Sequence, residues 1–214
     1  MSTPTTTARK RLTAAERREV IERAALDLFA ERGYHGASMD EIARRSGVTP
    51  PVVYDHFASK VELHKRLLER TREELLEMWR VNLAGDDPAE VRIPRALEAW
   101  ALYVEEHPYT ARMYFFETTG EAEVAAIHRE IQGEARAALG AILASEEGSE
   151  NVPGSPDPQA LEMAAEVLRS GLAGLAIWWQ DHPDVPRERI VATAVNAVWI
   201  GLERARRGDT WPAN

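Results

Sequence analysis

The chain contains no cysteine, and this absence excludes several classes of protein at once. Without thiols there is no disulfide framework, no thiolate nucleophile and no sulfur-ligated metal site. No apolar run reaches the roughly 18 to 20 residues that cross a bilayer, and the polar start MSTPTTTARKRLT lacks the apolar centre of a secretory signal. We therefore expect a soluble, cytoplasmic protein with no membrane partner.

Recognisable catalytic motifs are also missing. The six histidines are scattered along the chain, and none belongs to an H-E-x-x-H motif or to a Glu-x-x-His pair repeated on two helices. The pair Ser46-Gly47 does not stand in the setting of a nucleophile elbow. We therefore expect no enzymatic activity, no cofactor and no metal site.

Positive charge is scarce in most of the chain. Residues 1–60 carry ten Lys or Arg against eight Asp or Glu, a balance of +2, whereas residues 61–214 carry sixteen against twenty-seven, a balance of −11. This asymmetry suits a small DNA-reading module joined to an acidic body that DNA repels. The alternative is that the acidic body only aids solubility.

The alternating pattern of strands is absent, and helical periodicity predicts an all-α fold. Thr13 precedes an amphipathic segment with Glu16 three residues on, as in a capping box, and Gly33 is expected to end this first helix. Ser38 then caps a short helix that ends at Gly47.

A third helix is expected after Thr49, which is placed to cap it with a contribution of about 1 kcal/mol. Pro50 and Pro51 follow, at positions where a missing N–H group costs little. Because a proline restricts the residue before it, either of the two is a possible first helical residue. Val53 and Phe57 are expected to face inward.

The remaining chain predicts a long helix and then a bundle. Ser59 starts a helix to about Leu83, and the GDDP sequence at 85–88 breaks it. Further helices are expected around RALEAWALYVEEH, from Pro108, from about Glu121 to Ala144, and on either side of HPDVP, with a polar loop at 145–158.

Two short helices joined by a Ser-Gly-Val-Thr turn predict a helix-turn-helix unit. Over residues 13 to about 63 the sequence resembles the TetR family of bacterial transcriptional repressors, most clearly in AALDLFAERGYHGASMDEIARRSGVTPPVVYDHFASKVEL. The resemblance implies a helix-turn-helix DNA-binding domain at 13–60 and a ligand-binding and dimerisation bundle at 61–214, about nine helices in all. It also implies double-stranded operator DNA as a partner.

The resemblance also implies which residues meet DNA. It places Thr49, Tyr54 and Lys60 against the backbone and Pro50, Val52 and His56 near bases, and we add Ser38 at the start of the second helix. The family more often has a basic or hydroxyl residue at 50, Gly at 51 and a hydroxyl or small residue at 52. Apolar side chains here offer contacts only to groups such as thymine methyls, so recognition is expected to depend on DNA shape. For Tyr54 a core position is the alternative.

Residues 1–12 form a Thr-rich segment that is expected to be a disordered basic arm. Arg9, Lys10 and Arg11 are suited to contact phosphates or a minor groove. A solvated tail without DNA contacts is the alternative.

The body is expected to bind a small-molecule effector, as the resemblance implies. Pockets are mostly apolar with a few polar groups, and the candidate lining residues are Trp100, Tyr103, Met113, Phe116, His128 and Trp178. Aromatic residues at helical spacing also suit a plain core. We expect a small apolar or aromatic effector to weaken operator binding, which describes a ligand-released repressor. A helical adaptor that binds only proteins is the alternative function.

A homodimer is expected through the last two helices. In the last one, Val191, Val195, Val198 and Leu202 form one row, and Ile190, Ala194, Ala197 and Gly201 form an adjacent row of mostly small residues. Two apolar rows indicate two neighbours, one of them in a second chain. Coverage of both rows by the same chain is the alternative.

Overall fold

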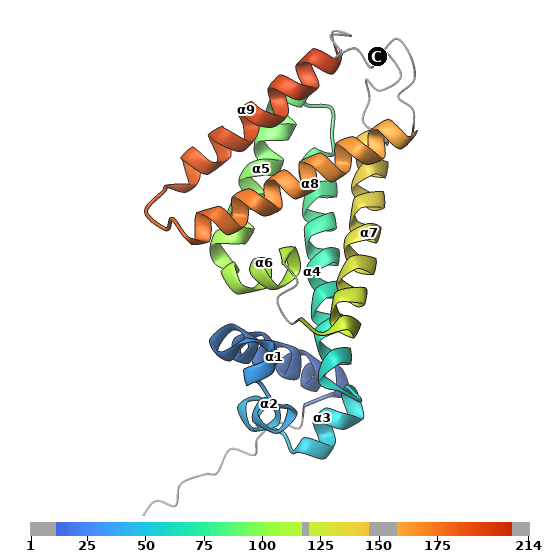
Figure 1. The fold of residues 1–214 in the computed structure, drawn as a ribbon, viewed down its shortest axis with the longest axis vertical. Coiled ribbons are helices and arrows are strands. Elements are labelled where there is room, and N and C mark those ends of the chain that lie inside the picture. The colour runs from blue at the N-terminus through green and yellow to red at the C-terminus, as the bar shows by residue number, and fades with distance from the viewer. Residues whose placement is uncertain (1–11, 117–119, 146–157, 207–214) are drawn as a thin grey trace, which may run out of the picture. The chain divides into compact units, whose positions relative to one another are not determined.

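The computed structural model describes residues 12–116, 120–145 and 158–206, and within these ranges it contains nine α-helices and no strand (Figure 1). The predicted all-α fold is therefore confirmed. The chain divides into two compact units, residues 1–67 and 68–214, and the division falls inside helix α4 (Lys60–Leu83).

The first unit contains α1 (Ala14–Gly36), α2 (Met39–Ser46), α3 (Pro50–His56) and the first residues of α4. The predicted capping box is present, since the backbone N–H of Thr13 donates to the Glu16 carboxylate at 2.7 Å and the Glu16 N–H donates to Thr13 Oγ1 at 3.2 Å. The regular helix is interrupted at Gly33 as expected, because the φ of 70° and ψ of 172° of this residue are not helical and favour glycine. A short helical segment follows the break, so that α1 extends to Gly36.

The turn between α2 and α3 depends on Gly47. This residue has φ 71° and ψ 24°, the left-handed conformation in which side chains with a Cβ are strained, and its N–H reaches the carbonyls of Ala43 and Arg44. The turn redirects the chain so that α3 packs on α2. The largest fully buried side chains of this unit are Ile21, Ile42, Val53, Phe57, Leu63 and Leu67.

The second unit is a bundle formed by the rest of α4 together with five more helices. These are α5 (Ala89–Glu106), α6 (Pro108–Phe115), α7 (Ala122–Ser145), α8 (Pro158–Gln180) and α9 (Arg187–Arg206). Helix α7 packs on α8, α5 packs on α9 and on α6, and α6 packs on α8. None of the helices in the described ranges is long and apolar enough to cross a membrane.

Helix α5 begins at Ala89, earlier than the sequence pattern indicated, and contains Pro94 within it. Two arginines of this first part turn back to the end of α4. Arg92 donates to the carbonyl of Leu83 at 2.6 Å, and Arg95 donates to that of Asn82 at 3.0 Å. They satisfy carbonyl groups that a helix end leaves without intrahelical partners.

Two groups of buried side chains form the core of the second unit. The Trp100 cluster joins α5, α6, α8 and α9, and consists of Leu97, Trp100, Ala101, Val104, Ala111, Leu172, Ala176, Trp179, Ile190 and Ala194. The smaller Leu75 cluster joins α4, α6 and α7, and consists of Leu68, Leu75, Tyr114 and Ile131.

Candidate nucleic-acid interface

The start of α3 is built from Thr49, Pro50 and Pro51. Helix α3 begins at Pro50, and Thr49 has an extended backbone, φ −85° and ψ 153°, as expected of a residue that precedes proline. Both prolines thus occupy positions whose N–H would have no helical acceptor.

The expected side-chain cap by Thr49 is wrong, because its side chain makes no capping hydrogen bond. Pro50 and Pro51 offer no N–H groups, and the N–H of Val52 donates to the Thr49 carbonyl at 3.0 Å instead. The first turn is therefore fixed by proline stiffness and by backbone hydrogen bonds.

One face of α3 is buried and the other is open to solvent. Val53 and Phe57 are fully buried, which confirms the predicted inward positions. Pro50, Pro51 and Asp55 are exposed, Val52 and His56 are half-buried, and Tyr54 is 48% exposed. A core position for Tyr54 is therefore excluded. The expected base-contacting residues lie on a short helix with a rigid start and an accessible face.

Lys60 is half-buried, and its ammonium group bonds within the first unit. Its Nζ donates to the carbonyl of Tyr34 at 2.9 Å and to that of Ala37 at 3.2 Å, and it lies 4.2 Å from the centre of the Tyr34 ring. Two of its three N–H donors are thus used within the unit. The phosphate contact expected for Lys60 stays a prediction, and no sequence pattern pointed to these two distant acceptors.

Ser38 caps α2 as predicted. Its exposed hydroxyl oxygen accepts the N–H of Glu41 at 3.2 Å and lies 3.3 Å from the Glu41 carboxylate. Arg44, in the last turn of α2, is an exposed cation that the sequence reasoning treated only as a helix-end charge. Its side chain is 75% exposed and approaches the Glu41 carboxylate only at 3.6 Å. The predicted arm residues Arg9, Lys10 and Arg11 lie outside the described residues.

The six expected pocket residues are not brought together in one place. Trp100 is buried in the Trp100 cluster, whereas Tyr103 and Met113 pack against the Leu75 cluster. Phe116 is exposed, and Trp178 is 46% exposed and stacked on His182 with 3.9 Å between ring centres. The sequence reasoning missed Met78, Phe115 and Ile127, which are half-buried and pack against the Leu75 cluster. Their helical spacing resembles that of any core residue, so no sequence signal distinguished them.

Tyr103, which packs against the Leu75 cluster, and Tyr114, which belongs to it, carry hydroxyl groups. The Tyr103 hydroxyl donates to the Glu74 carboxylate at 2.9 Å, and burial, together with that carboxylate, raises the pKa of Tyr103. His128 Nε2 lies 2.8 Å from the carbonyl of Tyr114. Burial raises the pKa of the Tyr114 hydroxyl to about 12. Both tyrosines therefore remain neutral at physiological pH.

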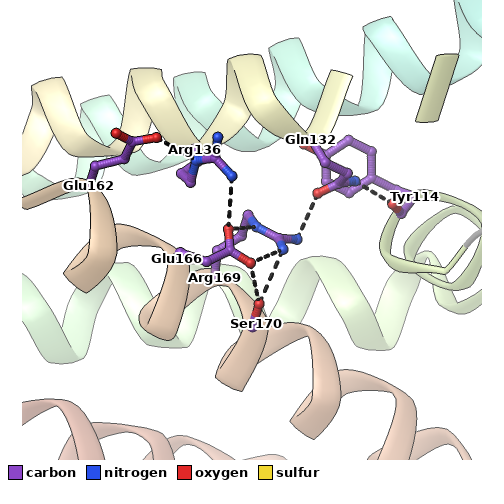
Figure 2. Close-up of polar contacts among 7 residues, drawn as sticks. All are labelled: Tyr114, Gln132, Arg136, Glu162, Glu166, Arg169 and Ser170. Carbon is purple, nitrogen blue, oxygen red and sulfur yellow. Dashed lines mark hydrogen bonds and ion pairs between the residues drawn. The ribbon is translucent and has the colours of Figure 1, made fainter. Parts of the chain in front are cut away.

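Figure 2 shows a chain of polar contacts that joins α6, α7 and α8. The Gln132 amide donates to the Tyr114 carbonyl at 2.6 Å, and its oxygen accepts from Arg169 at 2.8 Å. Arg169 also donates to the Glu166 carboxylate at 2.6 and 3.1 Å. The Arg169 hydrogen bonds, with a further one from Ser170, lower the pKa of Glu166 to about 2. Buried Gln132 thus links the end of α6 to α8.

Four of the five described residues in the two predicted rows of α9 lie against their own chain, whereas Ala197 is exposed. Ile190 and Ala194 are buried in the Trp100 cluster, and Val191 and Val195 pack against it. The alternative, coverage by the same chain, therefore holds for these four residues. The side chains of Val198, Gly201 and Leu202 lie outside the described residues.

The accessible α3 and the glycine turn before it define the first unit as a helix-turn-helix DNA-binding domain. Comparison with known proteins agrees, since residues 21–67 match the family model of bacterial regulatory proteins, tetR family. The transcriptional activator FasR of Mycolicibacterium smegmatis is 29% identical over 198 residues, covering 90% of this chain and 85% of FasR.

Solved structures show the same fold. A transcriptional regulator from Pseudomonas aeruginosa superposes with a TM-score of 0.73 at 21% identity, covering 92% of this chain and 96% of that one. FadR from Bacillus subtilis, solved in complex with stearoyl-CoA, superposes with a TM-score of 0.67 at 19% identity, covering 89% and 98%. Residues 21–67 therefore carry the DNA-binding domain of the TetR family, and the chain as a whole is similar to transcriptional regulators of that family, whose members bind operator DNA, respond to small molecules and act as dimers.

Proposed function

We propose that the chain is a ligand-released repressor that binds operator DNA through the exposed face of α3. The observation that carries this proposal is that Pro50 and Tyr54 are exposed and Val52 is half-buried on a helix whose Val53 is fully buried. Apolar side chains there favour contacts with thymine methyls and with DNA of suitable shape, and the Tyr54 hydroxyl suits a phosphate.

Tyr54 offers a direct test with a matched control. The duplex is one enriched from a random pool by the wild-type chain, and fluorescence anisotropy measures its affinity. Tyr54→Ala should weaken binding about tenfold, since a lost contact of this kind is worth about 1 to 2 kcal/mol. Tyr109→Ala removes another exposed tyrosine, from α6, and should leave binding unchanged. Equal affinities of the two variants for the duplex would exclude α3 as the proposed DNA-binding helix.

For the dimer we propose a contact centred on α8, with α9 beside it. Met163, Val167, Gly171, Gly174 and Trp178 are exposed and follow one another at intervals of three or four residues, so they share one face of α8. Val167 is 73% exposed, and a Cβ placed on either glycine would meet nothing within 4 Å. Such an apolar stripe with small residues suits close packing against its symmetric copy.

The oligomeric state tests this proposal. Sedimentation velocity should show a dimer for the wild type and a monomer for Val167→Arg, because the introduced charges would face each other across the symmetry axis. Val81→Arg places the same charge on another exposed valine, in α4, and should remain dimeric. If the Val167→Arg variant remains a dimer, the interface does not include this face of α8.

We propose that the effector is apolar and contacts the Leu75 cluster. The half-buried side chains that pack against this buried cluster are Met78, Tyr103, Met113, Phe115 and Ile127. Side chains of this kind suit an apolar ligand. The similar fold of Bacillus subtilis FadR was solved with stearoyl-CoA, which carries a long apolar chain. We therefore choose stearoyl-CoA as the first probe.

The switch is tested by linkage. If the effector releases DNA, then the enriched duplex must weaken stearoyl-CoA binding by the same factor by which stearoyl-CoA weakens duplex binding. Calorimetric titrations with and without duplex measure both factors, and equal stearoyl-CoA affinities would refute the switch for this compound. The relative FasR is named an activator. A reporter gene placed behind the enriched duplex therefore tests whether the bound protein lowers or raises transcription. Higher reporter expression in the presence of the protein would contradict repression.

A further inference from the structure

The hydroxyl group of Tyr114 is a buried donor that no described residue pairs. Tyr114 is 3% exposed and belongs to the Leu75 cluster, whose other members are apolar. His128 and Gln132 both approach its carbonyl oxygen, and neither they nor any other described residue forms a hydrogen bond with its hydroxyl. A buried hydroxyl without a partner destabilises a fold, so such a group in a native protein requires an explanation.

The second tyrosine at the same cluster is different. Tyr103 packs against the Leu75 cluster from α5, and its hydroxyl donates to the Glu74 carboxylate at 2.9 Å. One of the two tyrosine donors is therefore satisfied by the chain itself. The donor of Tyr114 remains for a group from outside the described residues.

The position of Tyr114 is fixed by contacts that do not involve its hydroxyl. The Gln132 amide donates to its carbonyl at 2.6 Å, as Figure 2 shows, and its ring meets that of Phe115 edge to face with 5.3 Å between the centres. A donor held in this way loses little conformational freedom when it binds a ligand. Met78 and Met113, which are half-buried beside the cluster, have flexible side chains that adapt to a ligand.

The charges near the hydroxyl determine which kind of acceptor suits it. Burial raises the pKa of Tyr114 to about 12, whereas the positive charges of Arg169 and Arg72 act in the opposite direction. The hydroxyl is therefore a protonated donor at physiological pH. Arg169 is paired with Glu166 and Arg72 with Glu134, so the two cations are already neutralised. A free carboxylate buried beside these pairs would cost more than a neutral carbonyl group.

From this arrangement we infer that the Tyr114 hydroxyl is the polar anchor of the effector site and donates a hydrogen bond to the neutral carbonyl oxygen of an acyl thioester or ester. The inference rests on the proposed contact between an apolar effector and the Leu75 cluster. The acyl chain of such a ligand packs against the half-buried side chains around the cluster, and the carbonyl oxygen pairs the buried donor. Loss of the hydroxyl should weaken binding about tenfold.

The test compares two ligands that differ only at the carbonyl group. Stearoyl-CoA carries a thioester carbonyl, and S-octadecyl-CoA has a methylene group in its place. In calorimetric titrations, Tyr114→Phe should bind stearoyl-CoA about tenfold more weakly than wild type and should bind S-octadecyl-CoA within about twofold of wild type. Tyr109→Phe, which removes an exposed hydroxyl from the same helix, should bind both compounds as wild type does. Equal effects of Tyr114→Phe on the two ligands would overturn the inference.

Stearate distinguishes a neutral carbonyl group from a free carboxylate. Its affinity should be within about twofold of wild type in Tyr114→Phe, because the inferred acceptor is not an anion. A tenfold loss of stearate affinity in Tyr114→Phe, with stearoyl-CoA binding unchanged, would assign the hydroxyl to a carboxylate and overturn the inference.

Thermal unfolding without ligand provides a second readout. Tyr114→Phe removes an unpaired donor and should leave the midpoint unchanged or raise it, whereas Tyr103→Phe removes a donor bonded to Glu74 and should lower it by at least about 3 °C. A similar decrease in Tyr114→Phe would reveal a partner within the chain and overturn the inference.

The binding data also separate this inference from the proposed effector. If wild type bound neither stearoyl-CoA, S-octadecyl-CoA nor stearate, the proposed effector class would fail, and the anchor would fail with it. If wild type and Tyr114→Phe bound stearoyl-CoA with equal affinity, the anchor alone would be excluded.

Discussion

Gln132→Leu removes the buried amide that links α6 to α8 and keeps a side chain of similar size. Two hydrogen bonds are lost, one donated to the Tyr114 carbonyl and one accepted from Arg169. The bond to a charged group is worth about 1.5 to 3 kcal/mol and the neutral one about 0.5 to 1.5 kcal/mol. His128 remains near the carbonyl and Glu166 remains with Arg169, so we expect a loss of about 2 to 4 kcal/mol in the free energy of unfolding.

Thermal and urea unfolding at one fixed protein concentration measure this loss, because dimer formation makes the midpoint depend on concentration. For a chain of this length about 1 kcal/mol lowers the midpoint by about 2 to 4 °C, so Gln132→Leu should melt roughly 4 to 16 °C lower. Ser170→Ala, at the exposed end of the same network, should cost less than about 1 kcal/mol. A Gln132→Leu variant within about 0.5 kcal/mol of wild type would refute the importance of this link.

Three further predictions concern other parts of the chain. Gly47→Ala should cost about 1 kcal/mol in urea unfolding because its φ is 71°, whereas Gly133→Ala, at a helical position with open space around it, should be neutral or stabilising. The folded pKa of Glu166 is about 2 against an ordinary value of 4.5, so its stabilising effect is complete above pH 4.5 and lost as the pH falls toward 2. Glu166→Gln should accordingly flatten the loss of stability in that window, measured by acid titration of the unfolding midpoint. Deletion of residues 1–11 should reduce the salt slope of duplex binding by about 0.9 for each phosphate that the arm contacts, and an unchanged slope would exclude the arm.

Local sequence signals predicted much of the first unit. The capping box at Thr13, the cap at Ser38 and the turn at Gly47 each depend on residues within four positions of one another, and all three are present. The inward positions of Val53 and Phe57 followed from their spacing on a short helix. Such features are determined by nearby backbone geometry, which sequence patterns encode directly.

The sequence did not predict hydrogen bonds whose partners are distant in the chain or compete with one another. The Lys60 ammonium bonds to carbonyls that any residue at those positions would provide, so the sequence carried no sign of them. Thr49 makes no side-chain cap because Pro51 removes one of the usual donors and the other, the N–H of Val52, bonds to the Thr49 carbonyl. The apolar rows around Ile190 and Val191 on α9 were correctly identified as packing surfaces. Periodicity shows that a face is covered, but it does not show which helix covers it.

The central claim is that the exposed face of α3 enters duplex grooves twice in a symmetric dimer. Selection of bound duplexes from a random pool, followed by sequencing, tests it most directly. The account predicts an enriched inverted repeat whose half-sites are spaced by whole turns of DNA, about 34 Å or a multiple of it. A pool without enrichment, or an enriched single site without two-fold symmetry, would contradict the account.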